Sequence, residues 1–338
     1  MAKYPFENMV FKGGGVKAQA YVGVIRVLDE KYDVLKNIKR MAGGSSGAIF
    51  ATIVAISEGH KEVKAIMDDL DFQKVQQKEP DDFPAVLLPV KHLLDEHFGD
   101  AFCIHRLINN YGYYSTEYFH DWMKEKIHAA YMRKTGRTIE LDYKITFKEF
   151  YEVFQKDLVL FGTNVSRHKS FIFSKDHTPD MEVSFAVRVS MSIPLYFETQ
   201  EFEYPGEGTV DYFGDGGVMR NYPLNVFDVD DVPNYKTLGC LLVVNPTENP
   251  RTEIKDVMDF GKSLFETFVA VQDDHYRFFN DTQKNRTCYI DDLGISTYKF
   301  NLSKGDKDAL EKSGEEAIET FIKGYNERVK DKTEIVKN

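Results

Sequence analysis

The 338-residue sequence has few cysteines, no excess of positive charge and no long hydrophobic run. Each of these shortages argues against one class of protein. The three cysteines, Cys103, Cys240 and Cys288, are scattered, show no C-x-x-C spacing and leave one unpaired in any disulfide scheme. This pattern does not fit a disulfide framework, so we expect three buried thiols in a reducing compartment.

Acidic residues outnumber basic ones, with 54 aspartates and glutamates against 43 lysines and arginines and a formal net charge of -11. Nucleic-acid binding relies on a basic face that neutralises phosphates, so we expect no nucleic-acid partner. The first residues, MAKYPFEN, carry charge where a signal peptide needs an apolar run, and no stretch approaches the ~20 apolar residues of a membrane span. The sequence therefore predicts a cytoplasmic protein that meets membranes only peripherally, from the aqueous side.

Two strand–turn–helix units lie one after the other at the start of the chain. In the first, the apolar run 8–12 leads through three glycines into residues 16–28, whose apolar positions have helical spacing. In the second, residues 41–42 lead through GGSSG into the apolar run 48–54. Two such units in succession predict neighbouring parallel strands. Further strand-like runs lie at 158–164, 170–173, 238–245 and near 289.

Residues 68–150 interrupt this pattern with aromatic-rich, largely helical sequence, which we expect to form a helical insertion or cap. The run 240–244 is unbroken apolar, as is typical of a strand covered on both faces. Helical patterns return at 257–279 and around 310–322. The simplest organisation is a single three-layer α/β/α domain over residues 1–338, with a mainly parallel central sheet and the insertion within it.

The strongest local motif is Gly43-Gly44-Ser45-Ser46-Gly47, a G-x-S-x-G between a short strand and an apolar helix. Small residues permit the strained turn of a nucleophile elbow, which lifts the serine hydroxyl clear of the sheet. At a helix N-terminus, backbone donors and the helix dipole favour the negative charge that develops there. The motif predicts Ser45 as a nucleophile, although the same letters also occur in ordinary turns.

A serine nucleophile needs donors for its oxyanion, and Gly13-Gly14-Gly15 offers unhindered backbone N–H groups at the end of the adjoining strand. Two other interpretations exist. Gly13, Gly15 and Ala18 match the dinucleotide fingerprint G-x-G-x-x-A, but residues 36–42 lack the apolar second strand ending in an acid that this motif requires. The second interpretation is that the three glycines form a tight turn with a purely structural role.

The general base has two candidates. Asp215 is flanked by three glycines after an apolar run, so its loop can approach another closely, and an apolar pocket would raise its pKa from the usual ~3.9. His275 comes after the acids in the order Ser, Asp, His found in α/β-hydrolases, but it lies in a charged helical stretch. An Asp-Gly turn without chemistry is the structural alternative for Asp215.

Three elements taken together, GGGVK at 13–17, GGSSG at 43–47 and DGG at 215–217, resemble the patatin-like phospholipase family in order and spacing. The segment RVSMSIPLYF at 188–197 is similar to the family's Ser-x-x-x-Pro-x-x-Phe segment, and NYPL at 221–224 resembles the residues just after the family's acidic motif. The resemblance covers roughly residues 8–245 and excludes the insertion.

The resemblance implies a lipid acyl hydrolase of the phospholipase A type, with a Ser45–Asp215 dyad, no histidine, and no metal or cofactor. The oxyanion donors it implies are the N–H groups of Gly13, Gly14, Gly15 and Val16. The residues that would support the motifs are Gly43, Gly47, Gly216 and Gly217. Its expected partner is a phospholipid or membrane surface, and some members need an activating ligand or protein. A His275-dependent esterase or thioesterase, and a catalytically silent lipid-binding or signalling module, remain open as alternatives.

Two segments are candidates for contact with lipid. The first is a helical stripe with basic neighbours, which suits either an anionic membrane or a packed core: Phe119, Trp122, Met123, Ile127, Ala130 and Tyr131. The second is the apolar run 86–94, a possible lid face. Lys17 suits either a phosphate headgroup or a solvated helix start.

Overall fold

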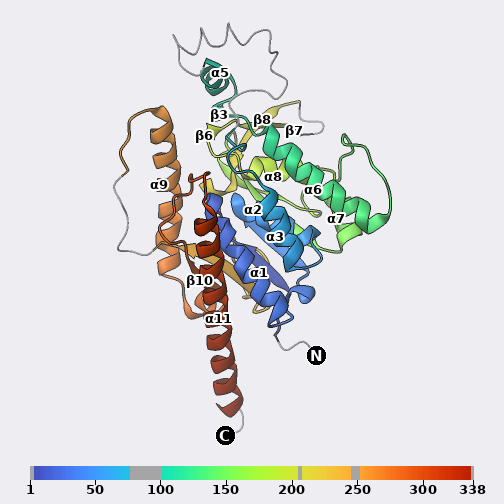
Figure 1. Cartoon of the computed structure of the whole chain (residues 1–338), viewed down its shortest axis with the longest axis vertical. Helices are drawn as coiled ribbons and strands as arrows, with labels where there is room; N and C mark the ends of the chain where they lie inside the picture. The colour runs from blue at the N-terminus through green and yellow to red at the C-terminus, as the bar shows by residue number, and fades with distance from the viewer. Residues whose placement is uncertain (1–3, 77–100, 205–207, 245–251, 336–338) are drawn as a thin grey trace.

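The computed structural model describes residues 4–76, 101–204, 208–244 and 252–335, and the side chains of all of these except 101–102 and 328–335. A twisted sheet runs through the centre of the molecule, and helices cover it (Figure 1). Its strands are β1 (Asn8–Phe11), β2 (Arg40–Gly44), β4 (Asp157–Asn164), β5 (Lys169–Phe173), β7 (Gln200–Glu203), β8 (Val210–Asp215), β9 (Thr237–Val243) and β10 (Thr287–Asp291).

The strand order is β10-β9-β1-β2-β4-β8-β7, with β5 also paired to β4. The pairs from β10 to β4 are parallel, so the predicted parallel neighbours β1 and β2 are confirmed. The strands β5, β7 and β8 are antiparallel to their neighbours. The strand β7 was not predicted, because its four residues, QEFE, are mostly polar. A separate pair joins β3 (Gly112–Tyr114) to β6 (Leu195–Phe197).

The described helices lie between the strands in sequence, except α11, which follows the last strand. They are η1 (Gly15–Gln19), α1 (Ala20–Glu30), η2 (Leu35–Asn37), α2 (Ser46–Ile56), α3 (His60–Asp69), α5 (Ala101–Asn109), α6 (Glu117–Thr135), α7 (Phe147–Phe154), α8 (Val183–Ser190), η4 (Gly216–Val218), α9 (Val257–Arg277), α10 (Asp281–Lys284) and α11 (Lys304–Ile335). The helices expected after the glycine loop, at 48–54, at 257–279 and at 310–322 are confirmed.

The parallel strands are buried on both faces, by two cores of unequal size. On β1, Met9 and Phe11 enter the larger core and Val10 enters the smaller one. The larger core lies under α1, α2, α3 and α11, which Figure 1 shows stacked on one side of the sheet. The smaller core is closed by residues 222–227 and by Phe279 just after α9. The predicted three-layer α/β architecture is confirmed. The outer layer over the smaller core is the thinner of the two.

Helices α1 and α11 pack backbone to backbone. A Cβ added to Gly23 would lie 1.9 Å from the carbonyl oxygen of Glu311, and one added to Gly314 would lie 1.9 Å from that of Ala20. No side chain fits at either contact. This close packing joins the C-terminal helix to the first helix of the chain.

The stretch 68–150 contains α5, α6, α7 and the short strand β3 in its described part. All six apolar residues of the stripe on α6 are buried, so this stripe packs in the core and does not face lipid. The candidate lid face at 86–94 lies outside the described residues. The three cysteines are buried and free, as expected. None of the described helices combines the length and apolarity needed to cross a membrane.

Candidate active site

Ser45 occupies a strained turn between β2 and α2. Its φ of 54° and ψ of -135° lie where non-glycine residues rarely occur. The turn needs glycine on both sides, because a Cβ on Gly43 would lie 2.3 Å from the backbone carbonyl of Gly47, and a Cβ on Gly47 would lie 2.3 Å from that of Phe11. The serine therefore sits at the N-terminus of α2, in the geometry of a nucleophile elbow.

The Ser45 hydroxyl donates a 2.7 Å hydrogen bond to Oδ2 of Asp215. Asp215 ends β8, and β4 pairs with both β8 and β2, so sheet pairing brings the two residues together. The other oxygen, Oδ1, accepts a 2.6 Å hydrogen bond from the N–H of Gly217. Gly216 lets this turn lie against β4, since a Cβ there would meet the carbonyl oxygen of Phe161 at 2.2 Å.

Burial raises the pKa of Asp215 from 3.8 to about 7, while the hydrogen bonds from Ser45 and Gly217 act in the opposite direction. Asp215 is completely buried and Ser45 nearly so. A general base is most effective when its pKa lies near the working pH. The protein environment thus turns a weak base into one suited to accept the proton of a serine hydroxyl at neutral pH.

The raised pKa of Asp215 predicts how ester hydrolysis would depend on pH with this residue as the general base. Below about pH 7 Asp215 is protonated and cannot accept a proton, and above it the carboxylate is free to act. We expect kcat/KM for a water-soluble ester to rise with pH through one ionisation near pH 7. The measurement is a profile of kcat/KM against pH, and activity that is already maximal near pH 5 would contradict Asp215 as the base.

The glycine loop after β1 lies directly beside the serine. A Cβ on Gly13 would lie 2.6 Å from the Cβ of Ser45, and Gly15 has a φ of 59°, which glycine adopts without strain. Three of the four expected donors already have acceptors: Gly13 N–H bonds the carbonyl of Asn221, Gly14 N–H bonds Ser46 Oγ and Val16 N–H bonds the carbonyl of Thr297. No described residue accepts from the N–H of Gly15. Of the four expected donors, the N–H of Gly15 is therefore the one without an acceptor among the described residues, and turning the Ser46 side chain would free that of Gly14.

Two residues outside the expected set hold this loop and the Asp215 turn. Asn221 accepts from Gly13 N–H at 3.1 Å and donates through Nδ2 to the Gly13 carbonyl at 3.3 Å. Gln272 on α9 accepts from the N–H of Asn221 at 2.8 Å and donates to the carbonyl of Gly217 at 2.7 Å. The sequence pattern singled out NYPL at 221–224 but gave Asn221 no role, and nothing in the sequence pointed to Gln272.

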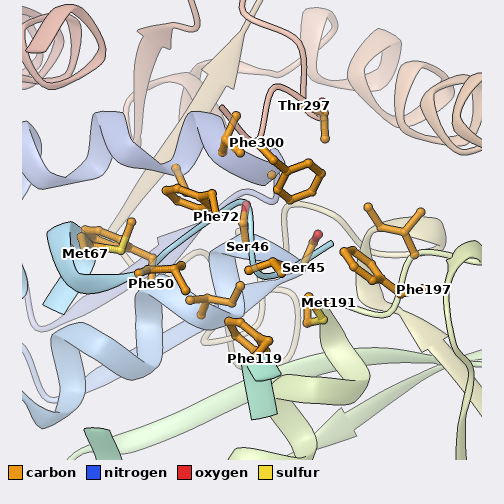
Figure 2. Close-up of a pocket in the computed structure, with 17 residues that line it drawn as sticks. Ser45, Ser46, Phe50, Met67, Phe72, Phe119, Met191, Phe197, Thr297 and Phe300 are labelled. Carbon is orange, nitrogen blue, oxygen red and sulfur yellow. The ribbon is translucent and has the colours of Figure 1, made fainter. Parts of the chain in front are cut away.

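An apolar pocket opens beside the serine. Its empty volume, counting the part open to solvent, is about 580 Å³. Figure 2 shows Ser45 near the middle of the lining residues, with Phe50 and Met67 on one side of it and Phe197 on the other. The lining is almost wholly apolar, so the pocket suits an acyl chain whose ester group lies at Ser45.

The segment 190–192 positions both members of the Ser45–Asp215 pair. Ser190 Oγ accepts from the N–H of Ser45 at 3.0 Å, and the carbonyl of Ser192 accepts from the N–H of Asp215 at 2.8 Å. Ser190 also donates to the carbonyl of Phe161 on β4 at 2.6 Å. The only sequence signal for this role was the similarity of 188–197 to the family's Ser-x-x-x-Pro-x-x-Phe segment.

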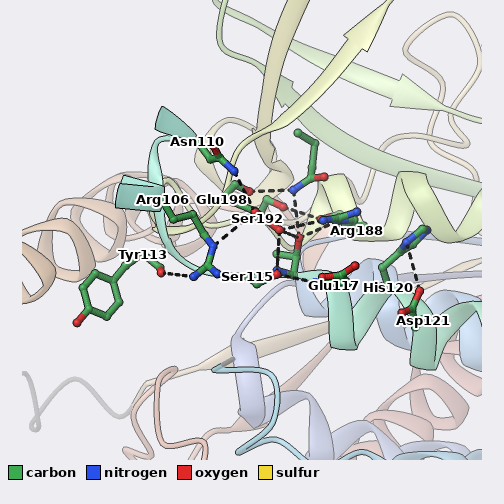
Figure 3. Close-up of polar contacts among 12 residues, drawn as sticks. Arg106, Asn110, Tyr113, Ser115, Glu117, His120, Asp121, Arg188, Ser192 and Glu198 are labelled. Atoms are coloured by element: carbon green, nitrogen blue, oxygen red, sulfur yellow. Dashed lines mark hydrogen bonds and ion pairs between the residues drawn. The ribbon is translucent and has the colours of Figure 1, made fainter. Parts of the chain in front are cut away.

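A buried polar cluster anchors α8, which ends at Ser190. Glu198 Oε1 accepts from Arg188 Nη2 and from the N–H of Thr116, each at 2.9 Å (Figure 3). Arg188 Nε also donates to Thr116 Oγ1 at 2.7 Å. Burial by itself would raise the pKa of Glu198, but the bonds from Thr116 and the charge of Arg188 lower it overall, so the carboxylate stays ionised. The cluster joins α6, α8 and β6 around the site.

Two other candidates lie away from this chemistry. His275 is exposed in the last turn of α9, and no described histidine bonds to Ser45. Lys17 is mostly buried and pairs with Asp292 at 2.8 Å, so it is neither solvated nor free for a headgroup. No described group of acidic, histidine or cysteine side chains has the arrangement of a metal site.

A family model of patatin-like phospholipases matches residues 9–228. The chain belongs to this family. The match spans the glycine loop, the Ser45 turn and the Asp215 turn, so the expectation drawn from these three motifs is confirmed. Among solved structures, VipD from Legionella pneumophila has the same fold as this patatin-like chain, with a TM-score of 0.58 at 18% identity over 95% of this chain and 67% of VipD.

Two relatives match over much of the chain. YqhO of Bacillus subtilis (strain 168), an uncharacterized protein, is 28% identical over 325 residues, which cover 94% of this chain and 98% of YqhO. The probable lipid hydrolase 463L of Invertebrate iridescent virus 6 is 24% identical over 222 residues, which cover 65% of this chain and 63% of 463L. Family membership and the second relative support a lipid hydrolase.

Proposed function

We propose that this patatin-like protein is a phospholipase A-type acyl hydrolase that cleaves fatty-acyl esters of glycerophospholipids through an acyl-Ser45 intermediate. The observation that carries the proposal is the 2.7 Å hydrogen bond from the Ser45 hydroxyl to the buried Asp215 carboxyl, beside an apolar pocket. The raised pKa of Asp215 supports its role as base. The family and the likeness to a probable lipid hydrolase support the substrate class.

In the first step, Asp215 accepts the hydroxyl proton as Ser45 Oγ attacks the ester carbonyl. The Gly15 N–H and the N-terminus of α2 stabilise the oxyanion, joined by Gly14 N–H once Ser46 turns away. Collapse breaks the ester bond, and the leaving lysophospholipid alcohol takes the proton from Asp215. Asp215 then accepts a proton from water as the water attacks the acyl-Ser45 ester. It passes this proton to Ser45 Oγ as the fatty acid leaves, which restores the serine hydroxyl and the carboxylate. No step uses a metal or cofactor.

The test combines fatty-acid release from phosphatidylcholine vesicles with fluorophosphonate labelling, both in the presence of a chelator. We expect the unmutated protein to release fatty acid and to be labelled at Ser45, and Ser45→Ala to do neither. Ser57→Ala, just beyond the other end of α2, is the matched control and should retain both. Release or labelling that survives in Ser45→Ala would refute the proposal.

The same experiment separates the alternatives. Vesicle binding without release or labelling by the unmutated protein would support a silent lipid-binding module instead. Loss of activity in His275→Ala would support the histidine-dependent esterase, whereas the exposed position of His275 leads us to expect full activity.

The pocket predicts a preference for acyl chain length that lining residues away from Ser45 control. Met67→Trp adds bulk to a part of the lining away from Ser45, so we expect at least about a tenfold loss of kcat/KM on a palmitoyl ester and little change on a butyryl ester. Steady-state kinetics on both esters measure this ratio. Thermal unfolding controls for overpacking, which typically costs about 1–3 kcal/mol. Equal losses on both esters would show that the chain does not extend toward Met67.

A further inference from the structure

Helix α9 presents apolar side chains to solvent along its first four turns. The exposed residues between 257 and 271 carry no charge: Val257, Phe260, Leu264, Thr267, Phe268, Ala270 and Val271. Five of them are large hydrophobic residues at helical spacing, which we call the outer face: Val257, Phe260, Leu264, Phe268 and Val271. Phe260 is 52% exposed and Val271 is 58% exposed.

The charged and amide side chains of α9 up to Asp273 are half-buried, and those of Lys262, Gln272 and Asp273 contact other parts of the fold. Lys262 Nζ lies 5.6 Å from the ring centre of Tyr196, and burial raises the pKa of Glu266. Asp273 pairs with the buried Lys12 at 2.8 Å, and Gln272 holds the backbone beside Asp215. Surface helices normally show the reverse polarity, with charge outward. Packing against the fold therefore does not account for the outer face.

The helix also forms part of the outside of the site. Figure 1 shows α9 at the edge of the molecule. On its inner side Phe265 is buried in the larger core, and a Cβ on Gly261 would lie 3.3 Å from Leu195 in β6. The same strand ends at Phe197, which lines the apolar pocket. A surface in contact with the outer face would thus lie close to the pocket.

We infer that the outer face of α9 docks on the surface of a zwitterionic lipid bilayer. The inference rests on the proposed function in one respect, which is that the substrate is a lipid. A contiguous row of exposed phenylalanine, leucine and valine is typical of helix faces that insert into a bilayer at the boundary between headgroups and acyl chains.

The residues beside the row favour lipid over a second copy of the chain. Helices that pair in coiled coils carry charged residues next to their apolar seam, which set partner and register. Within residues 257–271 the positions beside the outer face are Gly261, Ser263, Thr267 and Ala270, all of them uncharged. They provide no such charge pairs.

Charge also favours a zwitterionic surface over an anionic one. The exposed positions from 257 to 271 include no lysine or arginine, and the chain has a formal net charge of -11. Attraction to anionic headgroups needs clustered basic residues and fades with salt. Docking through the outer face is therefore apolar and insensitive to salt.

The test is flotation of the full chain with phosphatidylcholine vesicles, carried out in Ser45→Ala so that no lipid is consumed. The triple exchange Phe260→Ser, Leu264→Ser and Phe268→Ser is expected to weaken vesicle partitioning by at least about 30-fold. The control triple, Leu141→Ser, Val229→Ser and Val232→Ser, removes apolar side chains elsewhere that are at least as exposed, and it should float like the parent. Adding about 0.5 M salt should leave flotation unchanged.

Four results would overturn the inference. They are a parent protein that does not float, a triple variant that floats like the parent, flotation that requires phosphatidylglycerol and is lost in salt, and a parent dimer in sedimentation velocity that the triple variant converts to monomer. The last result would assign the outer face to a second copy of the chain.

A separate measurement distinguishes this inference from the proposed function. With Ser45 intact, the α9 triple variant should hydrolyse a water-soluble ester and react with fluorophosphonate like the unmutated protein, while losing activity on vesicles. Loss on both substrates would show that the exchanges damage the fold and would overturn a docking role for these residues. An unmutated protein that floats but hydrolyses neither substrate would contradict the proposed function and still support docking.

Discussion

Replacing Asp215 with asparagine is expected to lower kcat for ester hydrolysis by about 10⁴-fold or more, and Ser45→Ala by a similar factor. The hydroxyl of Ser45 donates to Asp215 and to no other described residue. Asparagine keeps the shape of the side chain and can still accept from Gly217, but it cannot take a proton. Because the turn stays intact in Asp215→Asn, the loss of kcat measures the contribution of the general base alone.

Single-turnover kinetics on a soluble ester measure both variants and the double variant. Because the two residues act as a unit, we expect the double variant to be no slower than either single one. Asp211→Asn makes the same exchange earlier on β8, where the carboxylate pairs with Arg167, and should stay within about threefold of the parent. Losses in the single variants that multiply in the double variant would show that Ser45 and Asp215 act independently.

Asp215→Asn is also expected to stabilise the fold above neutral pH, by roughly 3–4 kcal/mol. The folded pKa of about 7 lies above the ordinary value of 3.8, so the folded state holds this proton more tightly than the unfolded state does. The contribution of Asp215 to the free energy of unfolding is therefore fully present below about pH 4 and is lost as pH rises to about 7. Asparagine has no charge to bury, so the variant avoids this loss.

Urea unfolding at about pH 5 and pH 8 measures the effect. The stability gap between Asp215→Asn and the parent should widen from the lower to the higher pH, because the parent must then bury an ionised carboxylate. Ser45→Ala keeps the carboxyl but removes a hydrogen bond that lowers the pKa of Asp215, so this variant should lose at least as much stability as the parent between the two pH values. A parent that is the more stable protein at pH 8 would contradict the raised pKa. The two predictions for Asp215 together describe a residue that favours function at the expense of stability.

Much of the site was predictable because its signals are local. The glycines around Ser45 and in the loop 13–15 form two short runs of small residues that the sequence shows directly, although some of the contacts that require them, such as that of Gly15 with Thr297, are with distant segments. The pairing of β1 with β2 also came from two adjacent strand–turn–helix units. Asp215 was harder, because β8 reaches Ser45 only through β4, and the resemblance to a family supplied what spacing could not.

Other parts depended on contacts between distant segments. Ser190, Asn221 and Gln272 hold the two turns through hydrogen bonds to distant segments, which leave no periodic pattern in the sequence. The stripe on α6 had the composition of either a core or a lipid-binding face, and only its burial distinguished them. Helix α9 was expected at 257–279, but an amphipathic pattern does not show which side faces the protein.

The sequence by itself determined the family, the parallel core of the sheet and the two turns that carry Ser45 and Asp215, because these depend on residue type and on neighbours along the chain. Tertiary structure alone decided the 2.7 Å contact between Ser45 and Asp215, the burial that raises the pKa of Asp215 to about 7, and the outward direction of the apolar side of α9. Distance, desolvation and exposure are properties of packed surfaces, and residues far apart in the chain create them.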